Sequence, residues 1–103
     1  MISETTIRKV RELAIEDVLR PYVSLSRKGS TLMGLCPFHT ERTGSFAVTP
    51  SKNLFHCFSC NRGGDSITFI MEKENLSFSA AVEFIARNHN ILVEYISEER
   101  SEE

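Results

Sequence analysis

The chain is 103 residues long, with 41% hydrophobic residues, 25% charged residues and a formal net charge of −2, which fits one small globular domain. Its apolar runs are shorter than the roughly 20 residues of a membrane-spanning helix, and its N-terminus lacks the pattern of a signal peptide, so we expect neither a membrane protein nor an exported one. Charge is segregated: residues 20–64 carry six basic residues and one acidic residue, whereas residues 65–103 carry three basic and nine acidic residues. A basic segment in an acidic chain is typical of a surface that meets phosphates, the alternative being a chance distribution on a solvated surface.

The first elements are predicted to be helical. Ser3 is a suitable N-cap and Pro21 ends the pattern, so we expect one kinked helix or two short helices over residues 4–19. The apolar residues of this segment recur at helical spacing and indicate packing on the core: Ile7, Val10, Ala14 and Val18. Residues 22–35 then predict a β-hairpin with its turn at residues 27–30.

Two close pairs of potential metal ligands come next. Cys36 and His39 are separated by two residues, and Cys57 and Cys60 follow, again separated by two residues, after a gap of seventeen. This paired spacing predicts two knuckles that close a tetrahedral shell around one structural zinc ion. Three buried thiols and a surface histidine are the alternative, which leaves the paired spacing unexplained. Because all three cysteines belong to this group, we expect reduced thiols and a cytoplasmic protein.

Two strands are expected between the knuckles. Residues 45–49 alternate polar and apolar side chains, as a half-buried strand does, and residues 54–57 return as the next strand and deliver the second knuckle. This arrangement of knuckles on hairpin strands is a zinc ribbon.

A catalytic zinc site is the competing interpretation. Residues 39–41, with Cys57 and Cys60, match the H-x-E and C-x-x-C segments of zinc deaminases. However, Cys36 would occupy the position of the catalytic water, and His56 stands where that signature has proline. A shell closed by four protein ligands favours structural zinc.

Two helices and a strand are predicted after the knuckles. Asp65 is a suitable N-cap for a helix over residues 66–73, and Ser77 is one for the amphipathic stretch that follows it. Residues 91–95 alternate as a short last strand, and residues 97–103 resemble an acidic linker or tail. The expected fold class is therefore α+β, a zinc ribbon with a small antiparallel sheet flanked by N-terminal and C-terminal helices in one domain over residues 1–96.

Several motifs together resemble the N-terminal zinc-binding domain of bacterial DnaG-type DNA primases. They cover nearly the whole chain and comprise Cys36-Pro37-Phe38-His39, Glu41-Arg42-Thr43, Ser45-Phe46, Cys57-Phe58 through Cys60, and Gly63-Gly64-Asp65. The chain departs from the family at three positions, where Gly44 replaces a proline, Ser59 replaces a glycine, and Ala14 replaces an aspartate that often caps a second N-terminal helix.

The resemblance implies a template-binding module that helps to choose where RNA primers start in DNA replication. The resemblance also implies that RNA polymerisation is carried out by a catalytic domain, which acts in cis or in trans. It implies that the replicative helicase is bound only by regions absent from these residues. On this basis we expect no catalysis by these 103 residues alone. The alternative function is a stand-alone zinc-ribbon adaptor, for example one encoded by a mobile element, that binds a protein partner.

Single strands are bound by basic grooves that also offer aromatic faces. His56 neighbours Cys57 on a predicted strand, so it is expected on the opposite face from the metal, where it suits stacking or phosphate contact better than ligation. Phe58 offers a stacking face, and so do Phe46 and Phe55 unless they belong to the core. The predicted single-strand contacts are Arg42, Lys52, His56 and Arg62.

Overall fold

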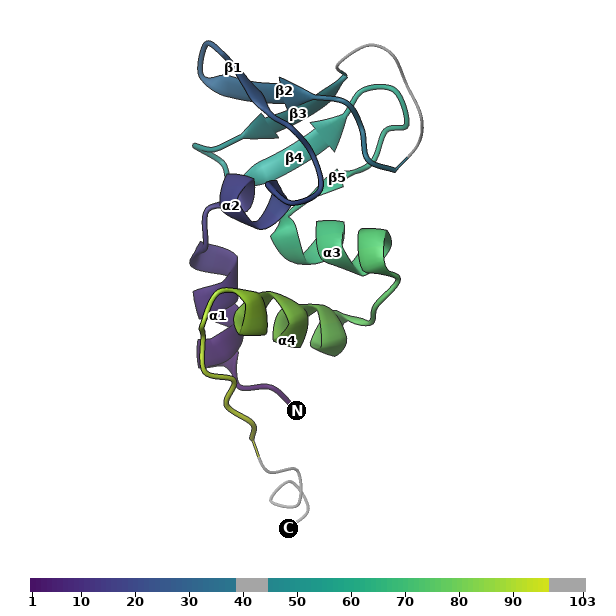
Figure 1. Ribbon diagram of the computed structural model, residues 1–103. Helices are drawn as coiled ribbons and strands as arrows, with labels where there is room; N and C mark the ends of the chain where they lie inside the picture. Colours follow the sequence, from purple (N-terminus) through teal and green to yellow (C-terminus); the bar gives the residue numbers. More distant parts are fainter. Residues whose placement is uncertain (39–44, 97–103) are drawn as a thin grey trace.

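The structure, a computed structural model, describes residues 1–38 and 45–96. A five-stranded antiparallel sheet lies at one end of the molecule, and four helices extend from it toward the N-terminus (Figure 1). Helices α2 and α3 lie next to the sheet, and α1 and α4 form the part farthest from it (Figure 1). The predicted α+β class with a small antiparallel sheet is confirmed.

The N-terminal segment forms two short helices, α1 (Glu4–Glu12) and α2 (Ile15–Leu19). Ser3 caps α1 as predicted, because its hydroxyl accepts a hydrogen bond from the Thr6 amide at 3.2 Å. The chain is extended at Leu13 and Ala14, and this break separates the two helices.

The sheet is a meander in which each strand pairs with the next one along the chain. Its strands are β1 (Ser26–Lys28), β2 (Thr31–Gly34), β3 (Phe46–Thr49), β4 (Leu54–Cys57) and β5 (Gly63–Gly64). The predicted first hairpin is present, but its turn is shorter than predicted: Lys28 belongs to β1 and pairs with Thr31, so the loop consists of residues 29 and 30 alone. Gly29 in that loop has a φ of +68°, the backbone conformation that such tight hairpin turns require.

Helices α3 (Ser66–Glu74) and α4 (Phe78–Asn88) follow the sheet. Both predicted caps are confirmed: Asp65 accepts from the Thr68 amide at 2.9 Å, and Ser77 accepts from the Ala80 amide at 3.3 Å. The predicted strand at 91–95 is wrong, because this segment makes only the isolated bridge between Ile2 and Tyr95. Its partner segment is too short for a ladder, since α1 already begins at residue 4.

An aromatic cluster joins the sheet to α3. Phe69 of α3 is fully buried, and its ring centroid lies 5.4 Å from that of Phe55 and 6.0 Å from that of Phe46. Tyr22 and Phe38 complete the cluster at 5.5 and 5.2 Å from Phe69. Phe46 and Phe55 are therefore core residues and are not available for base stacking.

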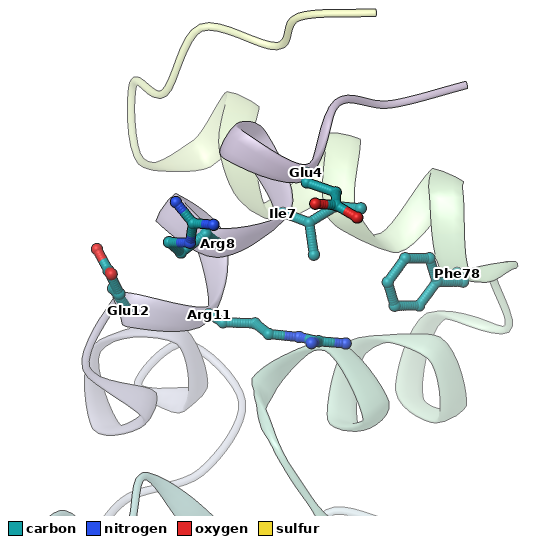
Figure 2. A pocket seen from close by; sticks show the side chains of 6 residues that line it. All are labelled: Glu4, Ile7, Arg8, Arg11, Glu12 and Phe78. Carbon is teal, nitrogen blue, oxygen red and sulfur yellow. The ribbon is translucent and has the colours of Figure 1, made fainter. Parts of the chain in front are cut away.

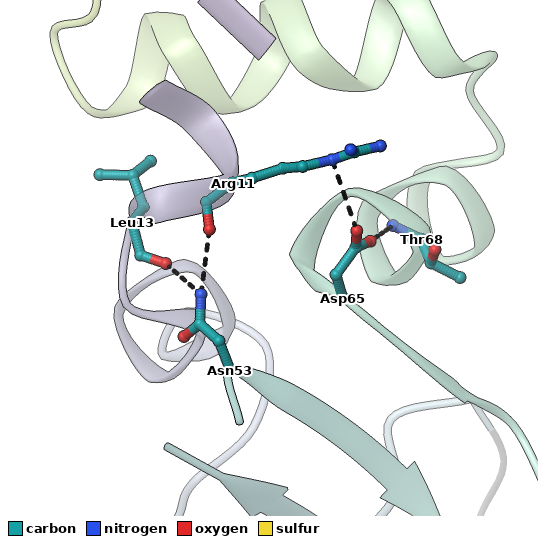
Figure 3. A network of polar contacts seen from close by, with 5 residues as sticks. All are labelled: Arg11, Leu13, Asn53, Asp65 and Thr68. Atoms are coloured by element: carbon teal, nitrogen blue, oxygen red, sulfur yellow. Dashed lines mark hydrogen bonds and ion pairs between the residues drawn. The ribbon is translucent and has the colours of Figure 1, made fainter. Parts of the chain in front are cut away.

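Asn53 connects the β3–β4 turn to the break between α1 and α2 (Figure 3). Its side-chain nitrogen donates to the carbonyl oxygens of Arg11 and Leu13 at 3.0 and 2.9 Å. Its side-chain oxygen accepts from the Ile15 amide at 2.9 Å, at the start of α2, where Ala14 supplies no side-chain cap. A residue 38 positions away in sequence thus replaces the missing local cap.

We expect Asn53→Gly to lower the free energy of unfolding by about 2 kcal/mol, because it removes three hydrogen bonds and leaves two partly buried backbone groups, at Leu13 and Ile15, without them. Glycine accepts the left-handed backbone at this position, where φ is 57°, so the change adds no strain. Thermal melting should show a midpoint lower by about 10 °C.

Asn75→Gly is the matched control. Asn75 has the same left-handed backbone, with a φ of 58°, but its side chain makes no hydrogen bond among the described residues. Its variant should melt within a few degrees of the wild type. Equal losses in the two variants would contradict the role assigned to Asn53.

Candidate metal centre

The sheet brings the two predicted knuckles to the same end of β3. Phe46, the first residue of β3, pairs with Gly34 of β2 on one side and with Cys57 of β4 on the other. Cys36 comes two residues after β2, Cys57 ends β4, and Cys60 lies in the connection to β5. Pairing of β3 with both neighbours therefore places all three cysteines together.

The three sulfurs have the spacing of a tetrahedral metal site. They all lie within 4.8 Å of one another, and the Sγ atoms of Cys36 and Cys60 are 3.8 Å apart. Zinc–sulfur bonds of about 2.3 Å in a tetrahedron place two sulfurs about 3.8 Å apart, whereas a disulfide needs about 2.05 Å. Among the described residues the three cysteines form no disulfide, and their donor chemistry fits zinc. His39, the fourth predicted ligand, lies outside the described residues.

Backbone hydrogen bonds shape the second knuckle. The Asn61 amide donates to the Cys57 carbonyl at 2.7 Å, and the Cys57 amide donates to the Arg62 carbonyl at 2.8 Å. The left-handed position of this turn is Asn61, with a φ of 64°, and not Ser59. The Ser59 side chain therefore adds no backbone strain to this knuckle, and its exposed hydroxyl lies 2.8 Å from that of Ser45.

The electrostatics of the cysteines explain why a cation is needed. Burial, together with the nearby Cys57 and Cys60 sulfurs, raises the pKa of the Cys36 thiol to about 12. Burial also disfavours ionisation of Cys57, but hydrogen bonds from the backbone of Cys60, the Cys36 thiol and the backbone of Ser59 lower its pKa to about 7. Only a positive charge at the centre lets three adjacent sulfurs ionise together.

The end of α3 contacts both knuckles. The Lys73 ammonium donates to the carbonyl oxygen of Pro37 at 3.2 Å. Glu72 accepts from the Arg62 Nε at 2.7 Å, and the Arg62 guanidinium lies over the Phe38 ring at 5.0 Å from its centroid. Phe38 belongs to the first knuckle and packs 5.2 Å from Phe69 of α3. The metal site is therefore attached to the helical layer on both sides.

The predicted single-strand contacts do not all share one face. His56 pairs with Ala47 and Gly63, and the alternation of the strand directs it away from the face that carries Cys57. Arg62 lies opposite Cys57, on the metal face, and Lys52 is exposed in the β3–β4 turn. Arg42 lies outside the described residues.

Two further side chains lie on the same face as His56: Phe58, which the sequence already offered for stacking, and Lys28 of β1. Phe58 is 69% exposed, and its ring centroid is 4.7 Å from that of His56. Lys28 is exposed and pairs with Thr31 of β2. Strand alternation places both residues on the same face of the sheet as His56. The alternation of side chains along the hairpin could have placed Lys28 on this face from the sequence alone, if the predicted turn had been limited to residues 29 and 30.

A groove at the helical end is separate from the metal site (Figure 2). The first helix supplies most of its lining, and Phe78 at the start of α4 closes one side with the Arg11 guanidinium 5.9 Å from its ring centroid. Its lining combines two glutamates with two arginines: Glu4, Ile7, Arg8, Arg11, Glu12 and Phe78.

None of the helices in the described ranges, 1–38 and 45–96, has the length and apolar character needed to cross a membrane.

Comparison with known proteins identifies the family of this site. The family model described as CHC2 zinc finger matches residues 2–101. The DNA primase of Helicobacter pylori strain 26695 is 45% identical over 96 residues, which cover 92% of this chain and 17% of that protein. The DNA primase of Streptomyces coelicolor is also 45% identical over 96 residues, covering 91% of this chain and 15% of that protein.

A solved structure has the same fold. The crystal structure of the Aquifex aeolicus primase, comprising its zinc-binding and RNA polymerase domains, matches with a TM-score of 0.80 and 37% identity. The match covers 91% of this chain and 24% of that one. The chain spans about a sixth of the length of the curated relatives it matches. The family and the cysteine group together identify one structural zinc ion as the cofactor.

Removal of zinc with excess chelator at neutral pH should unfold the region from Cys36 to Cys60. Structural zinc contributes roughly 10–16 kcal/mol of apparent binding free energy in small modules, which rivals the whole stability of a small domain. Circular dichroism and amide NMR spectra should lose the signals of the sheet, and zinc but not magnesium should restore them. Spectra and melting that stay unchanged after verified zinc removal would contradict a structural role.

Proposed function

Because the chain belongs to the CHC2 zinc finger family and matches the zinc-binding domain of bacterial DNA primases, we propose that it binds single-stranded template and helps to select primer start sites. RNA synthesis would be carried out by a catalytic domain in cis or in trans, and the replicative helicase would be met through other regions. Such a role would place the chain in the bacterial cytoplasm. The observation that carries the proposal is the contact between exposed Phe58 and half-buried His56 on the face of the sheet away from the zinc ligands.

In this proposal zinc is held by four protein ligands and has no catalytic position. Cys36, Cys57 and Cys60 would supply three sulfurs, and His39, three positions after Cys36 in the sequence, would supply the fourth ligand. The bound ion would neutralise the thiolates and fix the ends of β2 and β4 on either side of β3. The protein's contribution is thus a sheet of fixed shape rather than a site for hydrolysis.

The proposed strand-binding face consists of the outer side of the sheet and its turns. Phe58 and His56 offer flat surfaces for bases, and Lys52 and Lys28 supply positive charge at the turns of two hairpins. Arg42 precedes β3 and remains a predicted phosphate contact. Arg62 is also one of the four predicted single-strand contacts. Because its guanidinium already contacts Glu72 and Phe38 on the metal face, we expect it to contribute least to strand binding.

Single-strand affinity should fall on loss of either stacking or charge. Phe58→Ala should weaken binding of a labelled oligonucleotide by about 10- to 100-fold, because stacking contributes roughly 1–3 kcal/mol per base. Lys52→Ala and Arg42→Ala should weaken binding less, and each should reduce the slope of log affinity against log salt by about 0.7 per lost phosphate contact. Fluorescence anisotropy over a salt series measures both quantities.

Lys9→Ala is the matched control, since Lys9 is an exposed cation on α1. It changes the net charge as Lys52→Ala does, but it should leave the salt slope as in the wild type. Identical affinities and slopes for the Arg42, Lys52 and Lys9 variants would refute the proposed face. Failure of the wild type to bind any oligonucleotide at low salt would favour an adaptor that binds a protein.

A further inference from the structure

Arg62 occupies a position that strand binding does not explain. Its backbone carbonyl accepts the Cys57 amide at 2.8 Å, so it lies opposite Cys57 in the ladder between β4 and the start of β5. Its side chain therefore leaves the sheet on the metal face. There its guanidinium lies 5.0 Å from the centroid of Phe38 and donates to Glu72 at 2.7 Å, and the neighbouring Cys60 side chain raises the pKa of the guanidinium.

These contacts join three separate parts of the site. Cys60 belongs to the second knuckle, Phe38 to the first knuckle and Glu72 to α3. Planar guanidinium groups suit such a position, because they donate several hydrogen bonds in fixed directions and stack on aromatic rings. A lysine could supply the charge but not this combination of contacts.

Cys60 is the sulfur that most needs such support. Cys36 and Cys57 are buried, whereas Cys60 is only partly buried and is the most accessible of the three thiols. A zinc ion with three thiolates and a neutral histidine carries a net charge of −1, and water or a competing ligand reaches the accessible sulfur first. A cation held beside that sulfur stabilises its negative charge and favours one orientation of the cysteine side chain.

We propose that Arg62, held in place by Glu72 and Phe38, is a positioning residue that keeps Cys60 on the zinc ion and limits zinc exchange. The ion pair between Arg62 and Glu72 is then a support for the metal site and not an isolated surface contact. This inference rests on zinc ligation by the cysteines and is independent of template binding, so the two can fail separately.

The test is zinc transfer from the loaded chain to an excess of a chromogenic chelator. Arg62→Ala should speed transfer by about 10- to 100-fold, the usual range for loss of a residue that supports a metal ligand. Arg62→Lys and Glu72→Gln should give intermediate rates. Arg20→Ala is the matched control, because Arg20 forms an exposed ion pair with Asp17 at 3.2 Å away from the metal, and its transfer rate should equal that of the wild type.

Cobalt substitution separates positioning from general loosening of the fold. The sulfur-to-cobalt absorption band should shift in Arg62→Ala and stay in place in Arg20→Ala. If Arg62→Ala does not fold, Arg62→Lys and Glu72→Gln provide the same comparison. Wild-type transfer rates in these variants would overturn the inference, and so would faster transfer with an unshifted band. Weaker oligonucleotide binding with unchanged zinc transfer would instead assign Arg62 to the strand.

Discussion

Convergence of three sulfurs at one end of β3 is the constraint on which the rest of the structure depends. Burial opposes ionisation of the Cys36 thiol, so these sulfurs gather as ligands only around a cation. Once gathered, they fix the ends of β2 and β4 against β3, and each of these three strands is only four residues long. The zinc ion therefore acts through the shape of the sheet, whose outer face is left available for a partner.

Two further connections carry that constraint to the helices. The Phe69 cluster joins the inner face of the sheet to α3, and Asn53 joins the β3–β4 turn to the junction of α1 and α2. A third set of contacts, from Lys73 and Arg62, joins the end of α3 to the knuckles themselves. Because each connection starts from a strand or knuckle whose position depends on zinc, loss of the metal should affect the helical layer as well as the sheet.

Local chemistry made much of the fold predictable. Ligand spacing, the first hairpin and the caps Ser3, Asp65 and Ser77 depend on a few neighbouring residues, and the structure contains them, with a shorter hairpin turn than predicted and without His39, which stays a prediction. Tertiary effects were not predictable. The cap on α2 comes from 38 residues away, β5 consists of two glycines with no side-chain pattern, and the side of the sheet on which Arg62 lies depends on how the second knuckle turns.

X-ray absorption spectroscopy of the zinc-loaded chain tests the central claim most directly. A closed structural site predicts one zinc ion per chain with three sulfurs at about 2.3 Å and one nitrogen at about 2.0–2.1 Å. The nitrogen should disappear in His39→Ala while the three sulfurs stay. An oxygen ligand in the wild-type chain, or fewer than three sulfurs, would mean an open site and would contradict the account of zinc as the element that fixes the sheet.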